Sequence, residues 1–234
     1  MFIMVDGTDG SGKSTIVRAW RDMLEARGSQ IFETVAFEKA NGRLATIDDI
    51  GDATVILSGE PGYAGVGKIL RDVLLKTDGG ATPREITEAF AEQRLERYEA
   101  LIIPAIGRGL TILQDRGITT SLAYQPTMSQ EITEEFVAAL PGNELAIEYR
   151  PDVVVLCEVP PNVALERIAN RADKTDDSIF ERREYLERLT MRLHADSWKT
   201  YLTKRGTRFI SFDAAQPIAL AIKNAQHLLL DLLY

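Results

Sequence analysis

Cysteine and histidine are scarce in this chain of 234 residues, which has one cysteine, Cys157, and two histidines, His194 and His227. A single cysteine cannot form an internal disulfide, and Cys157 stands in the apolar run 153–157, where we expect a buried core thiol. The scarcity of both residue types excludes a metal site built from cysteine and histidine ligands. Because both histidines lie in helical patterns, we expect them to be surface or packing residues.

Long apolar runs are also missing. No apolar stretch approaches about 18 residues and no signal peptide is visible, so we expect a cytosolic protein with no membrane partner. The net charge of −8 argues against broad, nonspecific nucleic-acid binding, and we expect no stable nucleic-acid partner. The remaining composition, 45% hydrophobic and 26% charged, is that of an ordinary globular protein. A chain of this length usually forms one domain, here residues 1–234 with a mobile flap.

Short apolar runs alternate with helical patterns along the chain. We expect strands at residues 2–5, 31–37, 54–57, 110–113, 153–159 and 209–212. We expect helices at residues 14–27, 66–76, 83–106, 162–170, 180–204 and 217–232. The pattern fades at 38–52, an excursion or small hairpin without an assigned role, and a polar segment spans 117–125. Unbroken apolar strands between helices predict a parallel sheet covered on both faces, in a three-layer α/β fold.

A glycine-rich turn follows the first expected strand and leads into the first expected helix. Its residues are Gly7, Thr8, Asp9, Gly10, Ser11, Gly12, Lys13, Ser14 and Thr15. The spacing fits the phosphate-binding loop G-x-x-x-x-G-K-[ST], in which backbone N–H groups and the helix N-terminus cradle phosphate. Lys13 can reach the outer phosphates, and Ser14 can offer its hydroxyl to Mg²⁺. The loop therefore predicts a nucleoside triphosphate ligand, against the simpler alternative of a turn that binds nothing.

Asp115 and Arg116 come directly after another buried strand, so both side chains should emerge at its carboxyl end, where ligands bind in open α/β sheets. Asp115 could hold Mg²⁺ directly or through water. Arg116 could grip an acceptor phosphate with its planar guanidinium. The alternative is a capping aspartate beside a surface arginine.

Several further motifs stand in a fixed order with this loop. They are Glu60-Pro61-Gly62, Leu70-Arg71, Phe90 with Arg94, Asp115-Arg116, Ser121 to Gln125, Arg150-Pro151-Asp152, and Arg167 and Arg171 with Phe180-Glu181. Together they resemble the thymidylate kinases, P-loop enzymes that move the γ-phosphoryl group of ATP onto dTMP with Mg²⁺. The resemblance covers nearly the whole chain apart from residues 38–52. It implies a P-loop kinase fold, a mobile lid at about 167–181 and a homodimer.

The resemblance also implies roles for residues on the acceptor side. Arg71 and Arg116 would hold the acceptor phosphate. Asp9 would contact the 3′-hydroxyl and help to assemble the metal site. Glu60 and Pro61 would form the adjoining turn, whose peptide bond is a candidate for the cis form.

The base end of the acceptor is implied in the same way. Phe90 would stack on thymine and Arg94 would hydrogen-bond it. Tyr124 would lie beneath the deoxyribose, and Ser121 and Gln125 would lie near the base. An aromatic face suits any base, so stacking alone does not select thymine. A plain core position remains the alternative for Phe90.

Two departures from the family pattern bear on charge. Where the family carries an arginine before Glu-Pro-Gly, this chain has Gly59, and Lys68 is a candidate to compensate. Where some members carry an arginine in the loop, this chain has Ser11. The lid arginines Arg167 and Arg171 would then have to stabilise the migrating phosphoryl group. The alternative for this segment is a polar loop with solvated charges.

These features together predict an ATP-dependent kinase acting on dTMP. Another or modified deoxynucleotide, such as dUMP or a hydroxymethyl derivative, remains an alternative acceptor. A nucleotide-driven switch is an alternative from another class, although the chain lacks the Asn-Lys-x-Asp motif of guanine recognition.

Overall fold

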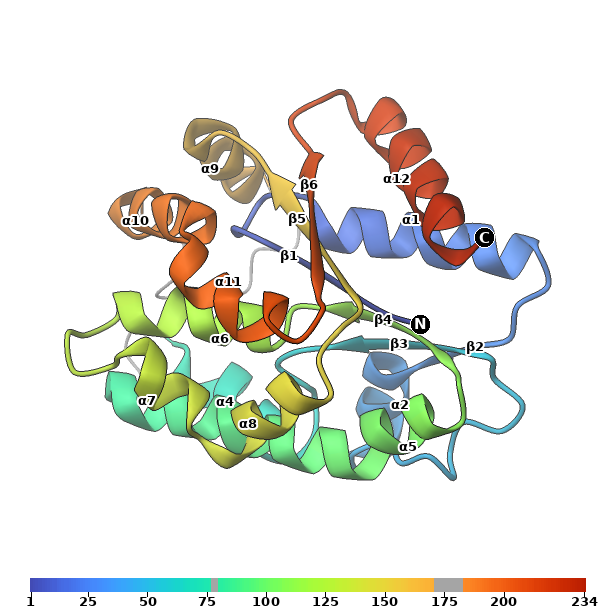
Figure 1. Cartoon of the computed structure of the whole chain (residues 1–234), viewed down its shortest axis with the longest axis horizontal. Coiled ribbons are helices and arrows are strands. Elements are labelled where there is room, and N and C mark those ends of the chain that lie inside the picture. Colours follow the sequence, from blue (N-terminus) through green and yellow to red (C-terminus); the bar gives the residue numbers. More distant parts are fainter. Residues whose placement is uncertain (77–79, 171–182) are drawn as a thin grey trace.

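The computed structural model describes residues 1–76, 80–170 and 183–234, and its centre is a six-stranded parallel sheet (Figure 1). The strands are β1 (Phe2–Gly7), β2 (Ile31–Glu33), β3 (Val55–Gly59), β4 (Thr111–Asp115), β5 (Val153–Glu158) and β6 (Arg208–Asp213). They are arranged in the order β2-β3-β4-β1-β5-β6. All six residues of β1 are buried, as expected for a strand covered on both faces.

Helices cover the two faces of this sheet unequally. One face packs on α1 (Lys13–Ala26) and α12 (Ile218–Leu233), which enclose a core with Trp20, Val155 and Leu229. The helices on the other side are α2 (Thr34–Asn41), α4 (Pro83–Arg97), α5 (Ile103–Gly107), α6 (Ile118–Tyr124), α7 (Glu134–Ala138), α8 (Pro141–Glu148) and α11 (Asp196–Thr203) (Figure 1). The remaining helices are α3 (Gly65–Ile69), α9 (Pro161–Ala169) and α10 (Arg183–His194). The predicted three-layer α/β fold is confirmed.

In the described part of the chain, two helical segments contain π-helical turns. The expected helix at 66–76 is α3 followed by a π-helical turn, Leu70–Leu74, which carries Arg71. The long helix expected from Pro83 is α4, a second π-helical turn, Tyr98–Ile102, and then α5. Thr82 begins α4 with a capping box, because its hydroxyl accepts the Glu85 N–H and the Glu85 carboxylate accepts the Thr82 N–H.

Three sequence-based expectations are wrong in detail. The strand expected at 31–37 ends at Glu33, and the chain turns into α2. The polar segment expected at 117–125 is mostly α6, whose residues Thr119 and Ser121 are buried through partners elsewhere in the fold. The helix expected at 180–204 is divided at Ala195 into α10 and α11. The expected lid lies outside the described residues from position 171 onward, and this includes Arg171.

The sheet order brings the two predicted ligand-binding segments together. β1 pairs with β4 in parallel, with Val5 opposite Asp115, so the loop after β1 and the Asp115-Arg116 pair emerge at one edge. β3 pairs with β4 on the other side, with Gly59 opposite Asp115, which adds the Glu60-Pro61-Gly62 turn to the same edge. In the described residues, no helix has both the length and the apolar composition to cross a membrane.

Candidate active site

The loop after β1 wraps around the start of α1. Gly12 precedes the helix with φ of 90°, and no side chain caps the helix N-terminus, so its first backbone N–H groups are not used by a capping residue. A Cβ at Gly10, where φ is 78°, would lie 2.4 Å from the carbonyl oxygen of Ala164 on α9. Only glycine therefore fits between this loop and α9. The arrangement has the geometry of the anion-binding cradle that the sequence predicts.

Lys13 is folded back onto this loop. Its Nζ donates to the carbonyl oxygens of Thr8 at 2.7 Å and Gly7 at 3.0 Å. Burial, and then the nearby Arg116 guanidinium, lower the pKa of Lys13 below its usual value. A buried ammonium that donates to carbonyl oxygens can exchange them for the stronger acceptor oxygens of a phosphate.

Ser14 and Asp115 form the metal-binding candidate. The Ser14 hydroxyl donates to Asp115 Oδ2 at 2.7 Å, and the other carboxylate oxygen, Oδ1, is buried without a hydrogen-bond partner among the described residues. An oxygen pair with an unused acceptor suits Mg²⁺. The described residues include no group of three or more acidic, histidine or cysteine side chains that could hold a metal alone. A cation here would thus have to share its coordination with nucleotide phosphates and water.

Arg116 crosses from β4 to the loop after β1. Its guanidinium lies 2.5 Å from Asp9 Oδ1 and 3.5 Å from Asp6 Oδ1, and it donates to the Tyr124 hydroxyl at 3.0 Å. Its backbone has a φ of 65°, the left-handed region that side chains rarely adopt. The fully buried Asp6 also accepts hydrogen bonds from Thr119 and Thr120 on α6. These contacts fix the direction of the guanidinium.

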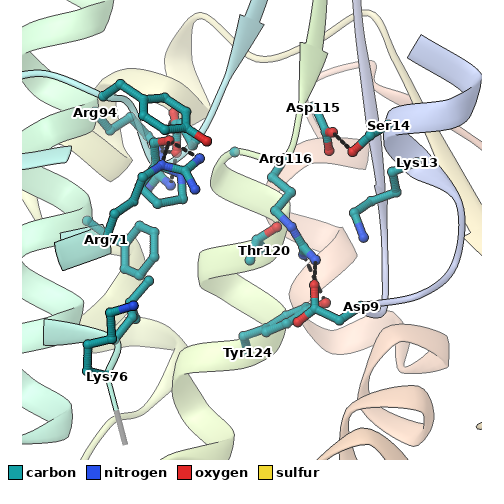
Figure 2. Close-up of a pocket in the computed structure, with 16 residues that line it drawn as sticks. Asp9, Lys13, Ser14, Arg71, Lys76, Arg94, Asp115, Arg116, Thr120 and Tyr124 are labelled. Carbon is teal, nitrogen blue, oxygen red and sulfur yellow. Dashed lines mark hydrogen bonds and ion pairs between the residues drawn. The ribbon is translucent and has the colours of Figure 1, made fainter. Parts of the chain in front are cut away.

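A cavity of about 340 Å³ lies in front of these groups. Figure 2 shows Lys13, Asp9 and Arg116 on one side of it and Arg71 and Lys76 on the other. The full lining is Asp9, Lys13, Ser14, Glu60, Pro61, Tyr63, Arg71, Leu75, Lys76, Phe90, Arg94, Asp115, Arg116, Gly117, Thr120 and Tyr124. Cations thus face the cavity from both sides, which suits an anionic ligand.

Arg71 is fixed by the turn that follows β3. It donates to the carbonyl oxygens of Pro61 and Gly62, and its guanidinium lies 4.1 Å from the centre of the Tyr63 ring. The Glu60-Pro61 peptide bond is cis, as anticipated from the sequence. The residues of this turn therefore shape one wall of the cavity together with Arg71.

The inner end of the cavity is aromatic and polar. Phe90, 6% exposed, packs with Leu70 and Ile86. Arg94, one turn later on α4, is 1% exposed and donates to Glu60, Asn143 and Ser121.

Ser121 and Gln125 do not line the cavity but lie behind Arg94. Gln125 donates to the Ser121 hydroxyl, and its own Oε1 has no partner among the described residues. The residues predicted for base recognition are thus brought together, with Arg94 placed by a buried ion pair to Glu60.

Arg167 and Lys68 occupy different surroundings from those expected. Arg167 on α9 donates to the carbonyl oxygens of Ala214 at 2.9 Å and Gly10 at 3.5 Å, on the outer side of the loop. Lys68 is exposed, pairs with Asp72 and does not line the cavity, so it does not replace the charge absent at Gly59. Lys76 lines the cavity instead, and sequence reasoning missed it together with Tyr63 and Thr120. None of these three stands in a motif that would have marked it.

The parallel sheet, the loop entering α1 and the cation-lined cavity at the strand ends define a P-loop nucleotide-binding protein. The family model described as thymidylate kinase matches residues 45–223. A thymidylate kinase of Xanthomonas euvesicatoria pv. vesicatoria is 32% identical over 192 residues, which is 80% of this chain and 68% of the relative.

Two other bacteria carry similar proteins. A thymidylate kinase of Neisseria gonorrhoeae is 30% identical over 74% of this chain and 71% of its own length. One from Bifidobacterium longum is 30% identical over 76% of each chain. The chain belongs to the thymidylate kinase family.

Proposed function

We propose that this protein transfers the γ-phosphoryl group of Mg²⁺-ATP to dTMP, giving dTDP and ADP. The observation that carries the proposal is a single cavity lined by the loop lysine, the Ser14–Asp115 pair and three arginines from other elements. Donor and acceptor phosphates would meet there with a cation on each side. Family membership supports this choice of donor and acceptor.

The donor side of the proposed reaction rests on the loop. The loop amides and Lys13 would hold the ATP phosphates, and Lys13 would exchange its carbonyl partners for phosphate oxygens. Ser14 and Asp115 would hold Mg²⁺, which when bound neutralises charge on the phosphates. Asp9 would help to order this region.

The acceptor side rests on the opposite wall. Arg71 and Arg116 would bind the dTMP phosphate and align one of its oxygens with the γ-phosphorus for in-line attack. Phe90 would stack on thymine, and Tyr124 would lie under the deoxyribose. Arg94 would donate to a carbonyl oxygen of the base, which favours thymine over cytosine because cytosine has an amino group at that position.

A coupled assay for ADP release across a panel of monophosphates tests the proposal. We expect dTMP to give the highest kcat/KM, with dUMP, dCMP, dAMP, dGMP and 5-hydroxymethyl-dUMP slower. A higher value for any of these would contradict the dTMP assignment. Nucleotide binding without acceptor-dependent ADP release would indicate a switch.

Lys13→Ala tests the donor side. Because catalysis of phosphoryl transfer depends on positioning and charge neutralisation, we expect kcat to fall by about 100-fold or more with the fold intact. Turnover at the normal rate would overturn the loop assignment. Lys204→Ala, at the exposed residue that follows α11, is a control expected to have no effect.

Three further properties belong to the same proposal. Arg171, with Arg167 beside the loop, would bring positive charge to the migrating group. The protein would act as a cytoplasmic enzyme and as a homodimer. Sedimentation velocity with and without nucleotides measures the oligomeric state, and a single species of about 26 kDa would contradict the dimer.

A further inference from the structure

The segment between β2 and β3 contains a buried carboxylate with no place in the mechanism above. Glu38, on α2, is 1% exposed. One of its oxygens, Oε1, accepts a hydrogen bond from Arg97 Nη2 at 2.6 Å, and Oε2 accepts the backbone N–H of Tyr63 at 2.7 Å. Glu38 therefore joins α2 to both α4 and the turn that follows β3.

The Glu38–Arg97 pair lies directly against that turn. A Cβ added at Gly62 would be 2.4 Å from Arg97 Nη2 and 2.8 Å from Glu38 Oε2. Arg97 is itself 2% exposed, so this is an ion pair enclosed on all sides. A buried charge pair keeps a defined geometry because separating the two partners would leave each charge buried and unpaired, which is strongly destabilising. The pair therefore sets how far Gly62 can move inward.

The other side of the turn is held by Arg71. Its guanidinium donates to the carbonyl oxygens of Pro61 and Gly62. The Glu38 carboxylate accepts a hydrogen bond from the backbone N–H of the next residue, Tyr63. The Tyr63 ring is also flanked by two cations, since Lys39 Nζ and the Arg71 guanidinium each lie 4.1 Å from its centre. Glu38 and Lys39 on α2 therefore contact residues 61–63, and the same three residues contact Arg71.

We propose that Glu38 is a positioning residue for Arg71, so that α2 sets the acceptor-phosphate site without touching the ligand. The backbone of residues 61–63 acts as the connection, with the α2 carboxylate on one side and the cavity arginine on the other. The proposal rests on the proposed function, since it concerns how the acceptor phosphate is held. It assigns to residues 34–41 a role in binding the acceptor and none in binding ATP.

Glu38→Gln is the direct test, because glutamine keeps the shape and one acceptor oxygen but removes the charge. We expect the KM for dTMP to rise about tenfold, as for loss of a charge-assisted hydrogen bond, with the KM for ATP unchanged. Asp49→Asn is the matched control. It removes an ion pair of the same segment, to Arg43, and has no contact with the turn among the recorded hydrogen bonds.

A double-mutant cycle separates positioning from a general loss of structure. If Glu38 acts through Arg71, Glu38→Gln should change the dTMP KM little when Arg71 is already alanine. Full additivity of the two substitutions, an unchanged dTMP KM in Glu38→Gln, or an equal rise in both KM values would each overturn the proposal.

Should Glu38→Gln not fold, Lys39→Met tests the part of the proposal that α2 sets the acceptor-phosphate site, because the Lys39 and Arg71 side chains both lie over the Tyr63 ring. Lys39 is exposed, so its replacement leaves the core intact, and we expect the dTMP KM alone to rise about twofold to threefold. An unchanged KM in that variant contradicts the proposal. A different result would contradict the proposed function itself: no dTMP-dependent release of ADP by the unaltered protein.

Discussion

Arg116 and Asp9 form an ion pair, with 2.5 Å between Nη2 and Oδ1, that joins the end of β4 to the loop after β1. The pair connects the candidate acceptor side to the candidate donor side through two side chains. An acceptor phosphate arriving at Arg116 would share the guanidinium with this carboxylate. The fork of Arg116 matters here because it offers several donors in one plane.

Arg116→Lys removes that fork and keeps the positive charge. We expect kcat/KM for dTMP to fall by about 100-fold, because a lysine ammonium lacks the planar donors that give a phosphate two parallel hydrogen bonds while another donor holds Asp9. Steady-state kinetics at saturating ATP measures the effect. Arg108→Lys is the control, since Arg108 is half exposed at the end of α5 and contacts only Ile47 and Asp48 among the recorded pairs. A loss below threefold at Arg116 would speak against its role.

Asp115→Asn tests the metal-binding pair. The amide keeps a hydrogen-bond partner for Ser14 but is a poor ligand for Mg²⁺. We expect the Mg²⁺ concentration at half-maximal activity to rise about tenfold or more, with metal-free nucleotide binding unchanged or slightly tighter. Titration of activity with MgCl₂, beside fluorescence titration with ATP in EDTA, measures both quantities. An unchanged Mg²⁺ requirement would remove Asp115 from the metal site.

Gly62→Ala tests how tightly the turn packs on the buried ion pair. The added methyl group would collide with Arg97 and Glu38, so we expect a loss of about 1–3 kcal/mol in the free energy of unfolding. Denaturant unfolding measures it. Gly107→Ala is the matched control, because a Cβ at Gly107 meets no atom within 4 Å. Equal free energies of unfolding for the two variants would show that the turn can move away from the ion pair to accommodate the methyl group.

Cys157 is expected to be inert. Burial raises the pKa of its thiol to about 12, so at pH 8 only about one molecule in ten thousand would carry the thiolate. Reaction with a thiol-specific reagent should be slow in the native protein and fast in denaturant. Because the thiol ionises near pH 9 in the unfolded chain and near pH 12 in the folded protein, the free energy of unfolding falls as the pH rises from 9 toward 12. Cys157→Ala should lack this part of the alkaline loss.

The parts of the site that could be predicted from sequence are those built from neighbouring residues. Gly12, Lys13 and Ser14 lie side by side, and the chemistry of phosphate binding requires that order. Asp115 and Arg116 follow a strand, and parallel pairing alone places them at the ligand-binding edge. In these cases local sequence and global topology carry the same information.

The parts that escaped prediction depend on partners far away in the chain. Glu38 and Arg97 are 59 positions apart, and each reads as a solvated helix charge until the fold encloses both. Likewise α6 looked like a polar connection because its Thr119 and Thr120 are hydrophilic. Their hydroxyls are satisfied by Asp6 in β1, more than a hundred residues earlier. Burial of polar groups cannot be inferred from a pattern that omits their partners.

The backbone of Arg116 has a wider consequence. In the described chain it is the only residue other than glycine with a positive φ, a conformation that costs an ordinary side chain about 1 kcal/mol. The ion pairs of Arg116 with Asp9 and the buried Asp6 offset that cost. Glycine or asparagine at position 116 would relax the backbone but leave both carboxylates without their cation, so the strained arginine is retained by its partners.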